Sequence, residues 1–247
     1  MKTNFKLIIQ YLGTSYNGWQ YQPTAPTIQN AIESAFKKIL HKNKQNINLI
    51  GSGRTDSGVH ALGQVANIKI NTNLSEKDIR NAINANLPGD IYISDCSVVD
   101  LDFNARFSAN KRCYIYKIDR EYTPFNNKFS WFNDNDINID LLEKSAELIL
   151  GKHNFSLLSK SNPEITNKDC NIYFSRWNTD MNQLIYTIKG NRFLHHMVRY
   201  LVGSMVEVGK KNISLNEFNN LLNNESNNLS IFKAPAHGLY LKKVYYE

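Results

Sequence analysis

The sequence contains few cysteines, and they do not suggest a disulfide or zinc framework. Cys96, Cys113 and Cys170 are odd in number, and no C-x-x-C pair is present. Long apolar runs are also missing, since none approaches the roughly 20 residues that cross a bilayer. The first residues lead straight into an apolar segment without the features of a signal peptide. These absences predict a cytoplasmic protein with no membrane association.

Motifs for nucleotide and metal binding are missing as well. Gly51, Gly53 and Gly58 do not have the G-x-G-x-x-G spacing of dinucleotide-binding loops, and no Gly-Lys-Ser/Thr follows them. Neither a nucleotide nor another cofactor is therefore expected. His195 and His196 predict no metal site, because adjacent residues on the helix expected there point about 100° apart, whereas metal-binding helices use i, i+4 spacing.

The composition is that of a folded, basic protein. Hydrophobic residues make up 42% of the 247 positions and charged residues 21%, which predicts a packed core. The chain is long enough for one large domain or two small ones. A formal net charge of +7 favours an anionic partner such as nucleic acid, but it also suits an ordinary soluble surface.

Apolar periodicity and capping residues predict two α+β halves joined near residues 103–112. The expected strands cover residues 5–12, 47–50, 65–70, 91–99, 113–118, 172–177, 184–189 and 239–246. The expected helices begin at Thr27, at Ser75 and Asp78, after a capping box of Asp140 and Glu143, near Arg192, and at Ser214 and Glu217. Asn-rich stretches at 133–138 and 219–228 are expected to be loops or helix ends.

The segment from Gly51 to Ala61 holds the strongest candidate for chemistry. Asp56 lies in a glycine-punctuated turn between two apolar runs, and the charge of Arg54 nearby favours an ionised carboxylate. Such a carboxylate in a cleft can act as base, nucleophile or metal ligand. The alternative is a structural turn in which Asp56 caps backbone amides. His60 is expected to brace this loop rather than to move protons.

Six segments carry a resemblance to a known family. They read Gly18-Trp19-Gln20-x-Gln22-Pro23, Gly53-Arg54-Thr55-Asp56-x-Gly58-Val59-His60-Ala61, Phe103-Asn104-Ala105-Arg106-Phe107-Ser108-Ala109, Tyr114-x-Tyr116, Phe193-Leu194-His195-His196-Met197-Val198-Arg199 and Ala234-Pro235-Ala236-His237-Gly238-Leu239. In these segments and in their order, the chain resembles the tRNA pseudouridine synthase A family from about Tyr11 to Leu241.

The resemblance implies a fold and an activity. The fold is α+β, with two related ferredoxin-like lobes, a merged antiparallel sheet and a catalytic cleft between the lobes. The expected lobes are residues 1–108, with the aspartate loop, and residues 109–247, with a stacking tyrosine and an arginine helix. The implied reaction converts uridine to pseudouridine at positions 38–40 of the tRNA anticodon stem-loop, without metal or cofactor. The family also implies a homodimer.

The resemblance assigns roles to residues at matching positions. Asp56 is the implied catalytic group, Tyr114 stacks on the target base, Arg199 pairs with the aspartate, and Arg54 contacts the RNA backbone. Tyr116, on the same strand face as Tyr114, is expected to be core. The residues implied or expected to meet RNA are Phe103, Asn104, Ala105, Arg106, Phe107 and Arg112, with Lys160 and Lys168 as further candidates.

Two alternatives remain beside this interpretation. One is a non-catalytic RNA-binding or chaperone module on the same scaffold, and the intact pair of Arg54 and Asp56 favours an enzyme over it. The other is a carboxylate-dependent nucleosidase or glycosidase. That chemistry uses a second positioned carboxylate, which the loop does not supply.

Overall fold

The computed structural model describes residues 2–40, 46–134, 136–225 and 231–246. The chain divides into two compact units, one formed by Met1–Asn110 with Leu241–Glu247 and the other by Lys111–Tyr240. Both units are α+β, and their strands are mostly antiparallel. Within the described residues, no helix combines the length and the apolar character needed to cross a bilayer.

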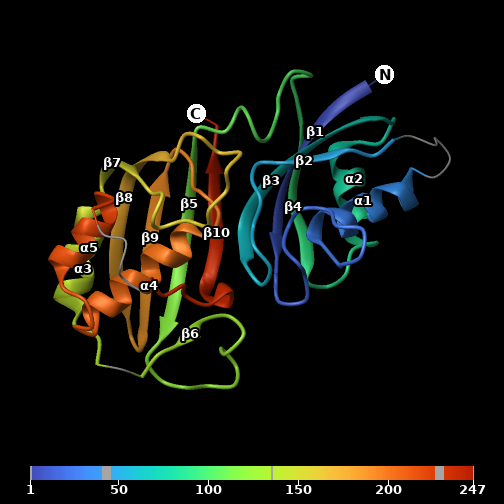
Figure 1. Cartoon of the computed structure of the whole chain (residues 1–247). Coiled ribbons are helices and arrows are strands. Elements are labelled where there is room, and N and C mark those ends of the chain that lie inside the picture. The colour runs from blue at the N-terminus through green and yellow to red at the C-terminus, as the bar shows by residue number, and fades with distance from the viewer. Residues whose placement is uncertain (1, 41–45, 135, 226–230, 247) are drawn as a thin grey trace. The chain divides into compact units, whose positions relative to one another are not determined.

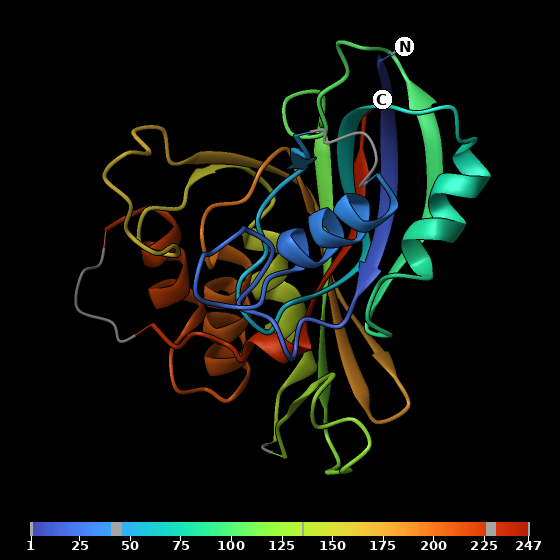
Figure 2. The same ribbon diagram turned by 90° about the vertical axis from the view of Figure 1, so that its right-hand side faces the viewer.

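The first unit is built on an antiparallel sheet. Its strands are β1 (Lys2–Tyr11), β2 (Leu49–Gly51), β3 (His60–Asn71), β4 (Ile91–Val99) and most of β10 (Leu239–Tyr245). Their order is β4-β1-β3-β10, with β2 paired to β3. The helices α1 (Ile28–Ile39) and α2 (Glu76–Asn84) lie on one face of this sheet (Figures 1 and 2).

Helix starts in this unit follow the sequence signals. The Thr27 hydroxyl accepts from the Asn30 N–H at the start of α1. Ser75 and Asp78 form a complete capping box at α2, so both predicted starts are confirmed. The apolar stripe of α1 is buried, as its spacing predicted.

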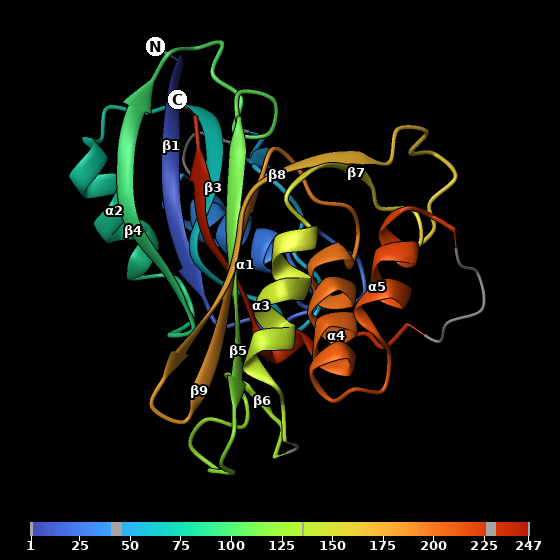
Figure 3. The ribbon, with the colours of Figure 1, turned by 90° about the vertical axis from the view of Figure 1, so that its left-hand side faces the viewer.

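The second unit places three helices over its own sheet. Its strands are β5 (Lys111–Asp119), β6 (Trp131–Phe132), β7 (Gly151–Asn154), β8 (Asp169–Asp180) and β9 (Gln183–Gly190), in the antiparallel order β5-β9-β8-β7 with β6 parallel to β5. The helices α3 (Ile139–Leu148), α4 (Met197–Gly209) and α5 (Leu215–Leu222) lie side by side on one face of these strands (Figure 3). A single 3₁₀ turn, η2 (Ala236–Gly238), precedes β10.

Two predicted helix starts are wrong. The cap of α3 is Asn138, whose side chain accepts from the Leu141 N–H, so Asp140 lies inside the first turn and no capping box begins there. Helix α4 begins at Met197 rather than near Arg192, and its N-cap His196 has a left-handed backbone with φ of 63°. The capping box of Ser214 and Glu217 at α5 is confirmed.

The Asn-rich stretches are helix ends and loops where the structure describes them. Asn138 caps α3 and Asn223 ends α5. Residues 135 and 226–228 of these stretches lie outside the described residues.

Candidate active site

Asp56 lies in the turn between β2 and β3 of the first unit, and this turn is closed by internal hydrogen bonds. The Val59 N–H donates to the Asp56 carbonyl oxygen at 3.2 Å. Gly58 has φ of 78°, a backbone conformation that favours glycine. Gln64 on β3, fully buried, donates to the Gly53 carbonyl at 2.9 Å. Hydrogen bonds within the protein therefore fix the backbone conformation at Asp56.

A second segment, residues 13–20, wraps around this turn. The Trp19 N–H donates to the Thr55 carbonyl at 3.1 Å, and the Gly58 N–H donates to the Tyr16 carbonyl at 3.4 Å. A Cβ on Gly18 would lie 2.4 Å from the Thr55 carbonyl oxygen, and Gly18 also has φ of 86°. Only glycine allows this close approach, so Gly18 lets the chain pass directly behind the residues that flank Asp56.

His60 braces the turn from inside the unit. It is fully buried, and its Nδ1 accepts from the Gly13 N–H at 3.0 Å. An Nδ1 that accepts leaves the proton of a neutral ring on Nε2. The predicted bracing role is confirmed.

Arg54 is exposed at the edge of the turn. Its Nε donates to the Gln20 side-chain oxygen at 3.0 Å, which ties the arginine to the wrapping segment. Because the guanidinium is planar, a bond at Nε also orients the remaining N–H donors.

Tyr114 and Tyr116 lie on β5 of the second unit in different environments. Tyr114 is half-buried, and its ring meets Phe193 edge-on with centroids 5.2 Å apart. Tyr116 is fully buried, and its hydroxyl donates to the Pro235 carbonyl at 2.7 Å. The prediction that Tyr116 belongs to the core is confirmed. Burial raises the pKa of Tyr116 well above its usual value, and the charge of Arg199 partly opposes that shift.

Arg199 lies in the first turn of α4 and is held by the segment that precedes η2. Its Nε donates to the Ala234 carbonyl at 2.7 Å, and the Ala234 N–H donates back to the Arg199 carbonyl at 3.1 Å. Gly203, one turn further along α4, lets this segment approach. A Cβ there would lie 2.0 Å from the Phe232 carbonyl oxygen. A glycine in the middle of α4 thus allows close contact with a neighbouring backbone.

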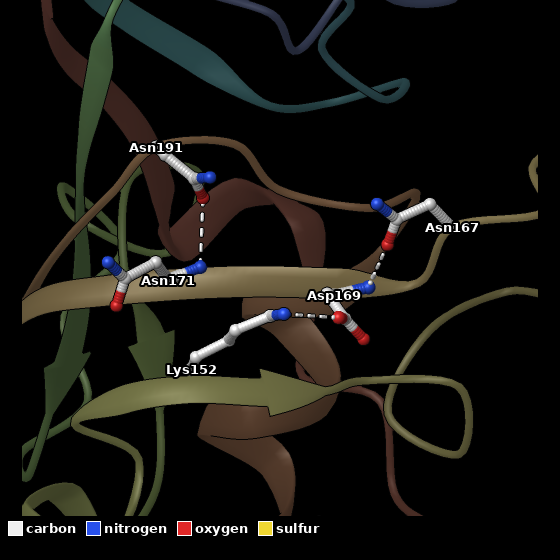
Figure 4. A network of polar contacts seen from close by, with 5 residues as sticks. All are labelled: Lys152, Asn167, Asp169, Asn171 and Asn191. Atoms are coloured by element: carbon white, nitrogen blue, oxygen red, sulfur yellow. Dashed lines mark hydrogen bonds and ion pairs between the residues drawn. The ribbon is translucent and has the colours of Figure 1, made fainter.

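Arg112 is bonded to Asn191, the residue that directly follows β9. Its Nη1 donates to the Asn191 carbonyl at 2.9 Å. The Asn191 side chain accepts from the Asn171 N–H, also at 2.9 Å, as Figure 4 shows. At the start of β8 in the same view, Lys152 of β7 pairs with Asp169 at 2.9 Å, so polar contacts fix this strand at several points.

The two adjacent histidines do not have the geometry expected of helical neighbours. His195 and His196 precede α4, and their ring centroids are 4.0 Å apart with planes inclined by 30°. The prediction that helical spacing holds the two rings apart is therefore wrong. The backbone here follows other contacts, including a bond of 2.9 Å from the Lys160 N–H to the His195 carbonyl.

The turn formed by residues 103–107 in the first unit is anchored by buried amides. The Ala105 N–H donates to the Asn67 side chain at 2.8 Å, and Asn67 in turn donates to Asn4 at 2.9 Å. Tyr246 donates to the Ala105 carbonyl at 2.8 Å. Ala105 is itself fully buried, so it supports the turn rather than presenting a side chain.

The same turn displays an arginine and a phenylalanine. The Asn104 side chain accepts from the N–H groups of Arg106 and Phe107 at 3.0 and 3.2 Å. The Phe107 side chain is 78% exposed, and the Arg106 guanidinium lies 5.4 Å from its ring centroid. Phe103, by contrast, packs against Tyr246 with ring centroids 5.0 Å apart.

Sequence reasoning did not identify the buried polar residues that support these turns. Asn4, Gln64 and Asn67 are fully buried, and they lie on strands that contain many buried apolar residues. A signal was present, because a polar side chain inside a buried strand needs a hydrogen-bond partner. The partner itself could not be read from the sequence.

Comparison with known proteins decides the family. The model of the tRNA pseudouridine synthase family matches residues 7–108 and 146–247. The chain belongs to this family. Among its relatives named tRNA pseudouridine synthase A, one from Hydrogenobaculum sp. is 38% identical over 98% of this chain and 99% of its own length. One from Dictyoglomus thermophilum is 39% identical, and one from Thermoanaerobacter sp. is 35% identical, with the same coverage.

The family model covers candidate residues in both units. Asp56, Arg54 and the turn of residues 103–107 lie inside the first stretch that matches the family model, and Arg199 lies inside the second. Tyr114 and Arg112 fall between the two stretches, so their roles rest on the local resemblance around Tyr114-x-Tyr116.

Proposed function

We propose that this chain isomerises uridine to pseudouridine in the tRNA anticodon stem-loop, at positions 38–40, and that Asp56 is its catalytic residue. The observation that carries the proposal is the position of Asp56. It lies in a turn closed by Gln64 and wrapped by residues 13–20, inside the first stretch that matches the family. A catalytic carboxylate requires such a fixed backbone.

The reaction needs little chemical equipment. The C1′–N1 bond of uridine breaks, the uracil turns, and a C1′–C5 bond forms. The hydrogen on C5 leaves as a proton and N1 gains a proton, so the substrate is neither oxidised nor reduced. One carboxylate is sufficient for these reaction steps, whether it attacks the sugar, attacks the base or removes a sugar proton.

The remaining site residues would bind and orient the RNA. Tyr114 would stack on the target base, and Arg54 would contact the backbone as the nucleotide leaves its helix. Flipping a nucleotide costs about a few kcal/mol, and base–aromatic stacking returns about 1–3 kcal/mol per base. Arg199 is the arginine that the resemblance pairs with the catalytic aspartate.

Three of the residues expected to meet RNA would contact it away from the reacting base. Arg106 and Phe107 are the side chains that their turn presents, and Arg112 would neutralise a phosphate from its place beside Asn191. Phe103, Asn104 and Ala105 would act mainly by shaping that turn, because their contacts lie within the first unit.

Release of tritium from tRNA labelled at uridine C5 tests the activity. The wild-type chain should release tritium while the base stays on the sugar. Asp56→Ala and Asp56→Asn should abolish release but still bind tRNA. Asp180→Asn, at an exposed hairpin end of the second unit, is the matched control and should remain active.

Two outcomes would contradict the proposal. Near wild-type release by either Asp56 variant would remove the catalytic assignment. Free uracil from the wild-type chain would indicate a nucleosidase, and tRNA binding with neither product would indicate a non-catalytic RNA-binding module.

The working form is proposed to be a cytoplasmic homodimer that contacts tRNA with both subunits. This rests on the family resemblance alone. Light scattering on the purified chain should give twice the 28.4 kDa monomer mass, and a monomer mass at assay concentrations would contradict it.

A further inference from the structure

A segment of the second unit, residues 232–238 and here called the strap, is bonded to Arg199 at both its backbone and its side chain. The Ala234 N–H donates to the Arg199 carbonyl, and the Ala234 carbonyl accepts from Arg199 Nε at 2.7 Å. Because the five N–H donors of a guanidinium lie in one plane, a fixed Nε sets the direction of the others. The strap therefore determines where the arginine points.

The strap is in turn held by Tyr116. The Tyr116 hydroxyl donates to the Pro235 carbonyl, the residue next to Ala234, at 2.7 Å. Tyr116 is fully buried in the middle of β5, opposite Tyr186 on β9, so its ring has little freedom to move. The bond connects a rigid strand to the peptide that orients Arg199.

Two glycines allow the strap to pack in direct contact with β5 and α4. A Cβ on Gly238 would lie 2.6 Å from the Tyr116 ring, and a Cβ on Gly203 would lie 2.0 Å from the Phe232 carbonyl oxygen. Contacts this short mean that the strap is seated directly on β5 and α4. A change at Tyr116 is thus transmitted to Ala234 rather than absorbed.

We propose that Tyr116 is a positioning residue for pseudouridine formation, and that it acts by fixing the strap that aims the Arg199 guanidinium. The proposal rests on the proposed function, because it requires Arg199 to contribute to turnover. Tyr116, the buried tyrosine of Tyr114-x-Tyr116, would thus have a role in turnover in addition to packing in the core. Tyr116 touches neither RNA nor the reacting atoms in this scheme.

Tyr116→Phe tests this role, since it keeps the ring and removes only the hydroxyl. We expect kcat for tritium release to fall about tenfold while the KM for tRNA changes less than about twofold, as is typical when a positioning contact is lost. Tyr186→Phe is the matched control. Tyr186 is also fully buried, and its hydroxyl bonds to Ser175 at 2.7 Å rather than to the strap. It should lower the melting temperature comparably and leave kcat within about twofold.

A double-mutant comparison separates positioning from general destabilisation. In an Arg199→Lys background, Tyr116→Phe should have no further effect on kcat, because the arginine that the strap aims is already absent. Equal losses in both backgrounds, or a wild-type kcat for Tyr116→Phe, would overturn the inference. Absence of tritium release from the wild-type chain would instead mean that the proposed function has failed.

Discussion

Gln64 donates to the carbonyl oxygen of Gly53 across 2.9 Å and thereby joins strand β3 to the turn that carries Asp56. The same side chain accepts from the Ser52 hydroxyl at 2.6 Å. Both ends of one amide are thus used inside the protein. Gln64 fixes the path of residues 52–53 just before the proposed catalytic residue.

Replacing Gln64 with leucine should damage both stability and turnover. Gln64→Leu leaves the Ser52 hydroxyl and the Gly53 carbonyl without this partner, which should lower the free energy of unfolding by about 1–3 kcal/mol. Urea denaturation and tritium release would measure the two effects. Gln10→Leu, on an exposed position of β1, should change stability by less than about 0.5 kcal/mol. Equal behaviour of the two variants would contradict the proposed role of Gln64.

Tyr114 should contribute through its ring more than through its hydroxyl. Tyr114→Phe keeps the aromatic face and the edge contact with Phe193, so it should retain partial activity. Tyr114→Ala removes the stacking surface and should lose most activity, consistent with about 1–3 kcal/mol per stacked base. Single-turnover rates would compare them. Equal rates for both variants would return Tyr114 to an ordinary packing role.

Arg106 and Phe107 should weaken tRNA binding in different ways. Arg106→Ala should reduce affinity and make its dependence on salt shallower, because one phosphate contact is lost. Phe107→Ala should reduce affinity by about 1–3 kcal/mol without changing the salt slope. Titrations of labelled tRNA at several salt concentrations measure both quantities.

Two surface residues of the second unit serve as controls for this pair. Arg176 and Phe125 are exposed, and Phe125 lies outside the stretches that match the family. Alanine at either position should leave the affinity and the salt slope near wild type. If Arg106→Ala keeps the full slope, the turn of residues 103–107 lies outside the RNA interface.

His237 should make stability fall at mildly acidic pH. Burial and the charge of Arg199 lower the pKa of this half-buried histidine, although its bond with the Ser130 backbone opposes the shift. The unfolded chain therefore binds a proton first as the pH falls below about 6.5, which favours unfolding. The drop in melting temperature between about pH 7.5 and pH 5.5 should be smaller in His237→Gln than in wild type. An equal or larger drop would assign the acid sensitivity elsewhere.

Gly203→Ala should loosen the strap. Although alanine is the better helix former by about 1 kcal/mol, its Cβ would meet the Phe232 carbonyl oxygen at 2.0 Å. We expect a net loss of about 1–3 kcal/mol in unfolding free energy and a lower kcat. Gly89→Ala is the control, because no heavy atom of the described residues, apart from its chain neighbours, lies within 4 Å of a Cβ built there. A Gly203→Ala variant as stable as wild type would show that the strap can shift without cost.

Local signals in the sequence predicted the elements whose determinants are local. The side chains of Ser75, Asp78, Ser214 and Glu217 cap helices within three residues of themselves, and those starts were predicted correctly. The strands predicted over residues 91–99, 172–177 and 184–189 also follow from patterns of near neighbours. Short-range periodicity is sufficient where the partner is the next turn or the next strand.

The misplaced start of α4 has a tertiary cause. The apolar spacing from Phe193 to Val198 continues a helical pattern, yet the backbone before Met197 is held by other bonds. Asn191 bonds with Asn171, and the His195 carbonyl accepts from Lys160. These partners are 20 and 35 residues away, so tertiary contacts overrode local propensity and no local pattern could have shown the change.

The contacts that hold the candidate site in place could not be predicted from the sequence for the same reason. Asp56 could be singled out from its glycine-punctuated turn, from Arg54 nearby and from the family resemblance. The wrapping of its turn by Gly18 and Trp19, the amide of Gln64 and the strap behind Arg199 join segments that are distant in the chain. The sequence singled out Asp56 as a candidate but did not show which residues hold its turn in place.

The assignment of β10 to the sheet of the first unit affects the order of folding during synthesis. Strand β3 pairs with β10, which the ribosome makes only after residues 111–238. At synthesis speeds of about 5–20 residues per second, roughly 8–34 seconds separate the emergence of the two strands. For that interval the part of β3 that pairs with β10 remains an unpaired strand edge, which is a liability for aggregation.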